Sequence, residues 1–291
     1  MLKFVIPKGS LEEQTLLLLR DSGLSVRRSG DREYNVRIDD ERFTYVAILR
    51  PQEIGKYVEE GLFDIGITGY DWVVETGSDV EIIADFPYAK RGASSSLRIV
   101  FAVGSNLGVE KAEEVPDGIR VATEYPNLSR RYFEKLGKSV KILPSAGATE
   151  AKVPHIADAV VEITETGSTL AAHGLLIIDE VLKTSTKLVA NKQSLKDSLK
   201  RKAIEEVKIL LTGAFEARGK VLLKLNVGPE DKERVLSILP AMRSPTISEL
   251  ADGGFAIETV AEKSSLAELI PRLKDNGATG ILEIPLGIVV P

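Results

Sequence analysis

The chain contains no cysteine, which excludes disulfide bonds, thiolate metal sites and cysteine nucleophiles. It contains only two histidines, His155 and His173, and two cannot build a histidine-rich zinc site. We expect each of them to be a loop or packing residue. Any bound metal is therefore expected to be a hard ion that oxygen atoms coordinate.

Long apolar runs are also absent. A membrane-spanning helix needs about 18 or more apolar residues in succession, whereas the longest dense stretches here are residues 16–19 and 175–178. Residues 1–7 are too short for the apolar region of a secretion signal and lack a small-residue cleavage site, so they are expected to form a strand. We expect no membrane partner and a location in the cytoplasm.

An excess of basic charge is missing as well, because the formal net charge is −5. Nucleic-acid binding normally leaves a strong basic excess, so we expect no nucleic-acid partner. The negative net charge does not exclude small anionic substrates, because the charges close to a binding site govern their binding.

Strand and helix patterns alternate through the first part of the chain. A capping box of Ser10 and Glu13 predicts the start of one helix, and Gly23 its end. A second helix is predicted from Pro51, in its first turn, to Glu60. The strands that flank these helices are predicted at residues 3–6, 45–49 and 63–68. This βαβ order predicts a parallel sheet covered by helices.

A second α/β block begins near residue 97. A helix is predicted at residues 126–136, and a short one follows residue 167. The strands of this block are predicted at residues 98–103, 119–122, 140–143, 158–163 and 175–178. Two successive α/β blocks predict two lobes with a cleft between them.

The pattern changes after a long helix predicted at residues 195–215. Strands are predicted at residues 221–227, 247–250, 255–261 and 280–290, and helices at 229–239 and 265–276. Their order is βαββαβ, that of a ferredoxin-like α+β domain. Ser265 and Glu268 form a predicted capping box, and Pro271 is expected to kink the last helix.

The segment most informative about chemistry is residues 157–170. A strand carries Glu162 near its end, and a loop of Thr166, Gly167, Ser168 and Thr169 then enters a helix. Unpaired N–H groups at a helix N-terminus attract phosphate, and glycine lets the backbone approach a ligand closely. An acid beside such a loop matches a sugar phosphate. The alternative is an ordinary turn followed by a helix cap.

Residues 160–170 resemble the phosphoribosyl-pyrophosphate segment of the ATP phosphoribosyltransferase family, in which an acidic residue precedes a Thr-Gly-x-Thr-Leu loop. Here Glu162 stands at a family position where Asp also occurs. The order and spacing of further elements support the resemblance over nearly the whole chain. These elements are residues 7–11 (Pro-Lys-Gly-Ser-Leu), 50–54 (Arg-Pro-Gln-Glu-Ile), 64–71 (Asp-Ile-Gly-Ile-Thr-Gly-Tyr-Asp), 122–128 (Ala-Thr-Glu-Tyr-Pro-Asn-Leu), 244–247 (Ser-Pro-Thr-Ile) and 277–282 (Gly-Ala-Thr-Gly-Ile-Leu).

The resemblance implies an α/β catalytic core with two lobes, like periplasmic binding proteins, followed by a ferredoxin-like (ACT-like) regulatory domain. That agrees with the order of the predicted elements. The expected parts are residues 1–96 with 185–212, residues 97–184, and residues 213–291. The third part marks the long form of the family, because the short form lacks it and relies on a separate regulatory subunit.

The implied reaction joins N1 of ATP to C1 of phosphoribosyl pyrophosphate and expels pyrophosphate, as the first step of histidine biosynthesis. Mg²⁺ is expected to hold the pyrophosphate, although no ligands for it are assigned. Such chemistry needs alignment and charge stabilisation rather than a nucleophile. The catalytic candidates are Glu162, Lys8 and Arg50.

The candidates for binding fall into two groups. The phosphoribosyl pyrophosphate is expected to contact Glu162, Thr164, Glu165, Thr166, Gly167, Ser168 and Thr169. ATP is expected to contact Lys8, Arg50, Asp71 and Tyr125, and Arg91 is a weaker cationic candidate. Asp71 could equally bind Mg²⁺ or cap the next helix, and Asn127 or Ser129 could cap the helix after Tyr125.

The family further implies feedback inhibition by histidine, with Asn226, Met242, Ser244 and Thr246 at the regulatory site, and a homo-oligomer of dimers that assemble into hexamers. Three other classes share some of these features. A type I phosphoribosyltransferase usually has two adjacent acids, whereas Val161 precedes Glu162 here. A solute-binding protein should carry an export signal, and a non-catalytic amino-acid sensor would not explain the phosphate loop.

Overall fold

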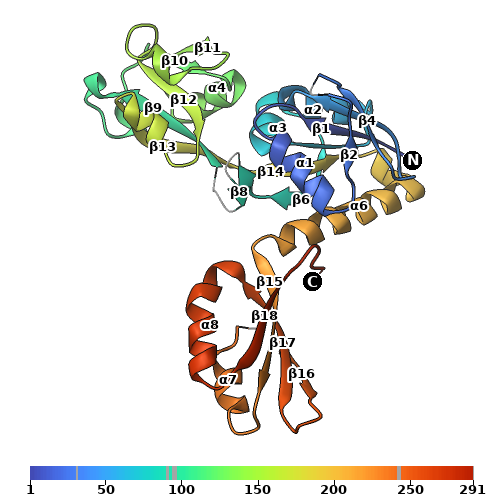
Figure 1. Ribbon diagram of the computed structural model, residues 1–291. Helices are drawn as coiled ribbons and strands as arrows, with labels where there is room; N and C mark the ends of the chain where they lie inside the picture. The colour runs from blue at the N-terminus through green and yellow to red at the C-terminus, as the bar shows by residue number, and fades with distance from the viewer. Residues whose placement is uncertain (31, 90–91, 94–96, 241–243, 291) are drawn as a thin grey trace. The chain divides into compact units, whose positions relative to one another are not determined.

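A computed structural model describes residues 1–30, 32–89, 92–93, 97–240 and 244–290 (Figure 1). The chain forms two compact units. One consists of Met1–Arg20 with Leu24–Lys208, and the other of Asp21–Gly23 with Ile209–Pro291. The first unit holds one large sheet for each predicted lobe and a two-stranded sheet, and the second unit holds a four-stranded sheet. The finer three-part division of the sequence stays a prediction.

Lobe I is built on a seven-stranded sheet in the order β2-β3-β4-β1-β5-β14-β6. Its strands are β1 Leu2–Pro7, β2 Val26–Arg27, β3 Asn35–Ile38, β4 Phe43–Leu49, β5 Ile65–Gly69, β6 Glu81–Phe86 and β14 Thr186–Ala190. β1 lies parallel to β4 and β5, as the βαβ pattern predicted. β3 and β14 pair antiparallel with their neighbours, so the prediction of a wholly parallel sheet was wrong.

Three helices belong to lobe I: α1 Glu12–Asp21, α2 Pro51–Glu59 and α3 Tyr70–Thr76. α2 follows its prediction, with Pro51 in the first turn. The capping box predicted for α1 was wrong, because the carboxylate that reaches back is that of Glu12, which accepts the N–H of Gly9 at 3.2 Å. Gly23 ends the helix in the left-handed conformation, with φ at 80°.

Lobe II is built on a five-stranded sheet in the order β11-β10-β12-β9-β13. Its elements are β9 Leu97–Gly104, β10 Arg120–Thr123, α4 Pro126–Lys135, β11 Lys141–Pro144, β12 Ala159–Thr164, α5 Ser168–Ala172 and β13 Leu175–Thr184. β10 is parallel to β11 and β12, and β9 is antiparallel to β12 and β13. Phe101 and Phe133 meet edge to face in the buried core, with ring centroids 4.9 Å apart.

The chain passes between the lobes twice, from β6 to β9 and back from β13 to β14. A short hairpin, β7 Tyr88–Ala89 with β8 Gly92–Ala93, lies on the first passage. The prediction of a two-lobed α/β core is therefore confirmed. Short 3₁₀ helices complete the chain at Ser105–Leu107, Ala112–Glu114, Glu150–Lys152, Ser194–Lys196 and Lys263–Ser265.

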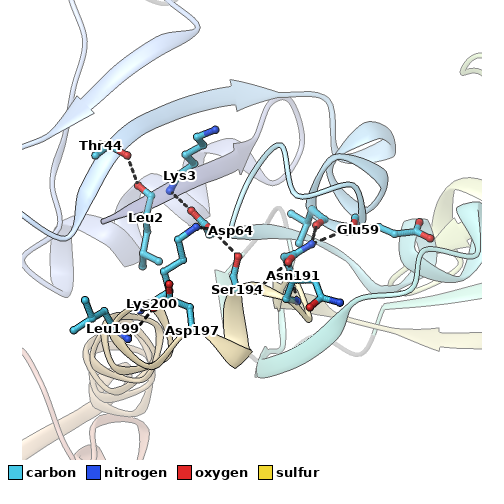
Figure 2. Close-up of polar contacts among 12 residues, drawn as sticks. Leu2, Lys3, Thr44, Glu59, Asp64, Asn191, Ser194, Asp197, Leu199 and Lys200 are labelled. Carbon is cyan, nitrogen blue, oxygen red and sulfur yellow. Dashed lines mark hydrogen bonds and ion pairs between the residues drawn. The ribbon is translucent and has the colours of Figure 1, made fainter.

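A buried carboxylate fixes the start of the long helix α6, Ser198–Ala217, to lobe I (Figure 2). Asp64 accepts the N–H of Lys3 at 2.7 Å, the hydroxyl of Ser194 at 2.6 Å and the ammonium of Lys200 at 2.7 Å. Burial alone would raise the pKa of Asp64, but these donors outweigh it and lower the pKa. The first Asp of the segment at residues 64–71 therefore has a structural role.

The second unit contains β15 Lys220–Val227, α7 Lys232–Ile238, β16 Thr246–Glu249, β17 Phe255–Glu262, α8 Leu266–Asp275 and β18 Thr279–Pro285. The sheet order β16-β17-β15-β18 is antiparallel throughout, and Figure 1 shows α7 and α8 on one face of it. Leu223, Val235 and Leu273 are fully buried between sheet and helices. The predicted βαββαβ domain is confirmed.

Details of this unit differ from expectation. The hydroxyl of Ser265 donates to the carbonyl of Glu262, so the predicted capping box with Glu268 does not form. β18 ends at Pro285, short of the predicted residue 290. α8 includes Pro271 and ends at Asp275, and the kink expected at Pro271 stays a prediction. Within the described part of the chain, the helices are too short or too polar to cross a membrane.

Candidate active site

A cavity of about 300 Å³ lies in the first unit, and residues of both lobes line it. Lys8, Arg50 and Asp71 come from lobe I, and Tyr125, Thr164 and Glu165 come from lobe II. The topology explains their meeting, since each residue lies at or just after the carboxyl end of a strand in its lobe's sheet. Ligands of open α/β sheets bind at this edge.

The cationic candidates lie side by side because β1 and β4 run parallel, with Pro7 paired to Leu49. An added Cβ at Gly9 would lie 3.5 Å from Nη1 of Arg50, which places that guanidinium against the loop after Lys8. The Lys8 ammonium lies 3.1 Å from a carboxylate oxygen of Glu12. Among the described residues, no carboxylate lies within ion-pair distance of Arg50, whose side chain is exposed. Its charge is available to an anionic ligand.

Two cationic side chains and one backbone N–H group donate hydrogen bonds to the carboxylate of Glu12. Arg28 donates to Glu12 at 2.7 Å, and Lys8 and the N–H of Gly9 donate as well. Burial would raise the pKa of Glu12, yet these hydrogen bonds together lower it. The carboxylate therefore stays ionised and orients Lys8 at the cavity.

Asp71 is buried, with 4% of its surface exposed. The hydroxyl of Thr184 donates to one carboxylate oxygen at 2.8 Å, and that of Tyr125 donates to the other at 3.0 Å. Burial is the main cause that raises the pKa of Asp71. Gly69, rather than Asp71, is the N-cap residue of α3, but the Asp71 carboxylate accepts the N–H groups of Asp71 and Trp72 in the first turn of that helix. The predicted N-cap position was wrong, whereas the predicted contact with the start of the helix is present.

Glu162 is a partly buried residue of β12. Burial raises its pKa from 4.5 to about 7, although hydrogen bonds from the hydroxyl of Thr149 and the N–H of Ile163 lower it. The nearby carboxylates of Glu124 and Glu150 raise it further. Glu162 therefore exchanges its proton near neutral pH.

The loop after β12 has the geometry of a tight turn into α5. The Thr164 hydroxyl accepts the N–H of Gly167 at 2.8 Å, and Gly167 adopts φ of 80°. The hydroxyls of Thr166 and Ser168 lie 3.0 Å apart, and both residues and Thr169 are exposed. The turn described as the alternative interpretation is present, and three exposed hydroxyl groups remain available to a ligand.

The backbone conformation of Gly167 favours glycine, because φ is 80°. A Cβ at this position would lie 2.9 Å from Cδ1 of Ile177. The end of the Ile177 side chain would have to shift, so the main cost of a side chain here is the strained backbone.

Comparison with known proteins identifies the family. A family model described as ATP phosphoribosyltransferase matches residues 50–213, and one described as HisG, C-terminal domain, matches residues 217–287. An ATP phosphoribosyltransferase of Koribacter versatilis is 45% identical over 290 residues, which cover 99% of this chain and 99% of that protein. The chain belongs to the ATP phosphoribosyltransferase family. It is thus a transferase of histidine biosynthesis, as the motifs predicted.

Other relatives agree with this assignment. An ATP phosphoribosyltransferase of Thermodesulfovibrio yellowstonii is 40% identical over 292 residues, covering 100% of this chain and 99% of that protein. Among solved structures, a chain of the ATP phosphoribosyl transferase (HisG:HisZ) complex from Thermotoga maritima matches with 29% identity and a TM-score of 0.59. The match covers 72% of this chain and 98% of that chain. The C-terminal domain places this chain with the long form of the family.

A loop that the sequence analysis did not single out supports Glu162. It connects β11 to the 3₁₀ helix Glu150–Lys152. Gly147 and Ala148 both have positive φ, at 98° and 49°, and Thr149 is the hydroxyl that bonds Glu162. Positive φ at a non-glycine residue is unusual and marks a constrained loop. The run of small residues before Thr149 was the available signal.

The residues expected to bind regulatory histidine lie in the second unit. Asn226 is on β15, Thr246 begins β16, and Ser244 precedes it. The pairing of β15 and β16 with β17 puts Asn226 and Thr246 on the sheet face away from α7 and α8. Met242, like the cationic candidate Arg91, lies outside the described residues.

Proposed function

We propose that the enzyme transfers the 5-phosphoribosyl group from phosphoribosyl pyrophosphate to N1 of ATP, giving N1-(5-phosphoribosyl)-ATP and pyrophosphate. The lone pair of N1 forms the new bond to C1 of the ribose, and the electron pair of the broken C1–O bond leaves with pyrophosphate. The observation that carries this proposal is that Lys8 and Arg50 line the cavity from lobe I, and Thr164 and Glu165, which lead into the hydroxyl-bearing loop, line it from lobe II.

The loop supports binding of the 5-phosphate. Thr166, Ser168 and Thr169 offer exposed hydroxyls at the start of α5, and Thr164 and Glu165 line the cavity before them. We assign Glu162 to the ribose, where its carboxylate would bind hydroxyl groups and stabilise the cation-like sugar. Such preorganised charge acts without reorganisation during the reaction.

Lys8 and Arg50 would neutralise the triphosphate or the leaving pyrophosphate, because both cations face the cavity from strand ends. The Asp71–Tyr125 pair would form the ATP side of the site. No cluster of three or more acidic, histidine or cysteine side chains suited to a metal occurs among the described residues. Mg²⁺ would thus be held chiefly by the substrate phosphates, with the charge neutralisation that phosphoryl groups need.

We further propose that the C-terminal domain binds histidine and inhibits the enzyme. The domain is a separate compact unit with its own core, and it presents Asn226 and Thr246 on one sheet face. Ser244 adjoins them, and Met242 completes the predicted set. Assembly into dimers and hexamers, and a location in the cytoplasm, stay predictions of the same kind.

A spectroscopic assay tests the reaction. The full chain is mixed with Mg²⁺, ATP and phosphoribosyl pyrophosphate, and the ultraviolet absorption of the adenine is followed. Substitution at N1 changes that absorption, so a time-dependent change that needs both substrates supports the proposal. Lys8→Ala and Arg50→Ala should weaken the response. An unchanged spectrum with folded protein would contradict it.

A further inference from the structure

Glu75 connects the two lobes through an unusual helix cap. It lies in α3 of lobe I, and 5% of its surface is exposed. One carboxylate oxygen accepts the N–H of Asn127 at 3.0 Å, and the other accepts the N–H of Leu128 at 2.8 Å. Both donors belong to the first turn of α4 in lobe II.

α4 has no cap of its own. Tyr125 is the N-cap residue and makes no side-chain capping bond, and Pro126 has no N–H to satisfy. The two candidates for a local cap are used elsewhere: Asn127 donates its amide to the carbonyl of Glu75 at 3.2 Å, and the Ser129 hydroxyl bonds Thr123. A carboxylate at a helix N-terminus also interacts favourably with the helix dipole. Glu75 therefore supplies from lobe I what α4 lacks.

Packing strengthens the same connection. Trp72 and Val74, both on α3, pack against the hydrophobic core of lobe II. The ring of Trp72 lies 4.7 Å from that of Tyr125, measured between centroids. Arg131 of α4 donates to the carbonyl of Val74 at 2.6 Å. α3 thus belongs to lobe I by sequence and contacts lobe II on one side.

We propose that Glu75 is a positioning residue for the reaction: by capping α4 across the lobes, it holds Glu124 and Tyr125 at the wall of the ATP site. These two residues immediately precede α4 and line the cavity, whereas Glu75 itself does not line it. The inference rests on the proposed function only in assigning ATP to that wall. Loss of the cap should let Tyr125 move away from Asp71 and Trp72.

Trp72 makes this movement measurable, since it is the only tryptophan of the chain. In Glu75→Gln and Glu75→Ala, the full-length protein should show red-shifted emission and stronger acrylamide quenching than the wild type. The KM for ATP should rise about ten- to hundredfold, the range for losing hydrogen bonds to a charged acceptor. The kcat and the KM for phosphoribosyl pyrophosphate should change less. Glu75→Asp should restore part of both effects.

Asp197→Ala is the matched control for Glu75→Ala, because alanine cannot cap a helix. Asp197 caps α6 through the N–H groups of Leu199 and Lys200, at 2.9 and 3.0 Å, within one lobe. It should lower the melting temperature without changing Trp72 emission or the KM for ATP. If the Glu75 variants also lower only the melting temperature, the positioning role is overturned.

The two readouts separate this inference from the proposed function. If the wild type lacked transferase activity but the Glu75 variants changed the emission of Trp72, the cap across the lobes would be supported and the proposed reaction would be refuted. If the wild type were active and both Glu75 variants kept its Trp72 emission and its KM for ATP, the reaction would be supported and the positioning role of Glu75 would be refuted. Because Glu75→Gln preserves the shape of the side chain, it serves as the folded variant if Glu75→Ala is unstable.

Discussion

The hydroxyl of Tyr125 in lobe II donates a 3.0 Å hydrogen bond to the buried carboxylate of Asp71 in lobe I. Burial and the adjacent Asp71 raise the pKa of Tyr125 well above its ordinary value, so the phenol stays protonated and remains the donor. The bond joins the lobes at the cavity. Both residues are predicted to contact ATP, and the structure shows a contact between the two residues themselves.

Tyr125→Phe should therefore affect stability and ATP binding together. It leaves one oxygen of Asp71 buried without its donor, which costs about 1–3 kcal/mol. Urea unfolding should report that loss, and the KM for ATP should rise. Tyr132→Phe is the matched control, because the Tyr132 hydroxyl bonds Asp179 at 2.5 Å within lobe II. Equal KM values for ATP in the two variants would count against a role of Tyr125 in the site.

The pKa of Glu162 predicts a pH-dependent stability. Its folded pKa of about 7 lies above the ordinary value of 4.5, so the folded protein holds this proton more tightly than the unfolded chain. The resulting stabilisation is complete below about pH 4.5 and is lost as the pH rises through about 7. The difference corresponds to a free energy on the order of 3 kcal/mol.

Glu162→Gln has no proton to lose, so the wild type should lose stability relative to this variant between about pH 5 and about pH 8. Urea unfolding of both proteins at both pH values measures the difference between their free energies of unfolding. If that difference is the same at the two pH values, Glu162 does not titrate in this range.

The same residue predicts a pH dependence of the reaction. If the ionised carboxylate stabilises the sugar cation, the kcat/KM for phosphoribosyl pyrophosphate should rise as the pH passes about 7. Glu162→Gln should lower kcat more than substrate affinity and abolish the rise. If Glu162→Gln showed the same pH profile and the same rate as the wild type, Glu162 would have no role in the mechanism.

Thr169→Ala tests the phosphate loop more cleanly than a change at Gly167. Thr169 is exposed, and its removal should weaken binding of phosphoribosyl pyrophosphate about ten- to hundredfold, with little change in melting temperature. Gly167→Val should abolish binding, but a valine at φ of 80° also strains the backbone and destabilises lobe II. Calorimetry on Thr169→Ala decides the point, and wild-type affinity would argue against the loop as the phosphate site.

Histidine inhibition should depend on the second unit. Ser244→Ala and Thr246→Ala should raise the histidine concentration needed for inhibition. The free energy that couples histidine binding to substrate binding is expected to be about 1–3 kcal/mol. Ser237→Ala is the control, because Ser237 is an exposed residue of α7, and α7 covers the other face of the sheet. A truncation should end after Arg218, because α6 continues to Ala217 and a cut after Gly213 would interrupt it. An active full chain that ignores millimolar histidine would refute the regulatory assignment.

The sequence predicted the elements whose signals are local. Apolar runs bounded by Gly23, Pro51, Gly61 or Gly137 marked the main strands and helices, since Pro51 begins a helix and the three glycines follow helix ends with positive φ. β2, β3, β6 and β14 were missed because runs of two to six residues carry little periodicity. Their antiparallel pairing changed the sheet from parallel to mixed.

The site could be predicted only where a motif marks it. The strand-end positions of Lys8, Arg50 and Thr164 follow from topology once the βαβ order is known. Contacts between distant residues could not be read in the same way. The cap from Glu75 joins residues 52 positions apart in the sequence, and the Cβ clash of Gly167 depends on Ile177 of another strand.

The most direct measurement is the structure of the product. The full chain is incubated with ATP, Mg²⁺ and phosphoribosyl pyrophosphate labelled with ¹³C at C1, and the nucleotide formed is examined by mass spectrometry and NMR. The account predicts a phosphoribosyl group joined through C1 to N1 of the adenine, with one pyrophosphate released for each product and neither formed without ATP. Attachment at another atom, or pyrophosphate release without ATP, would contradict it.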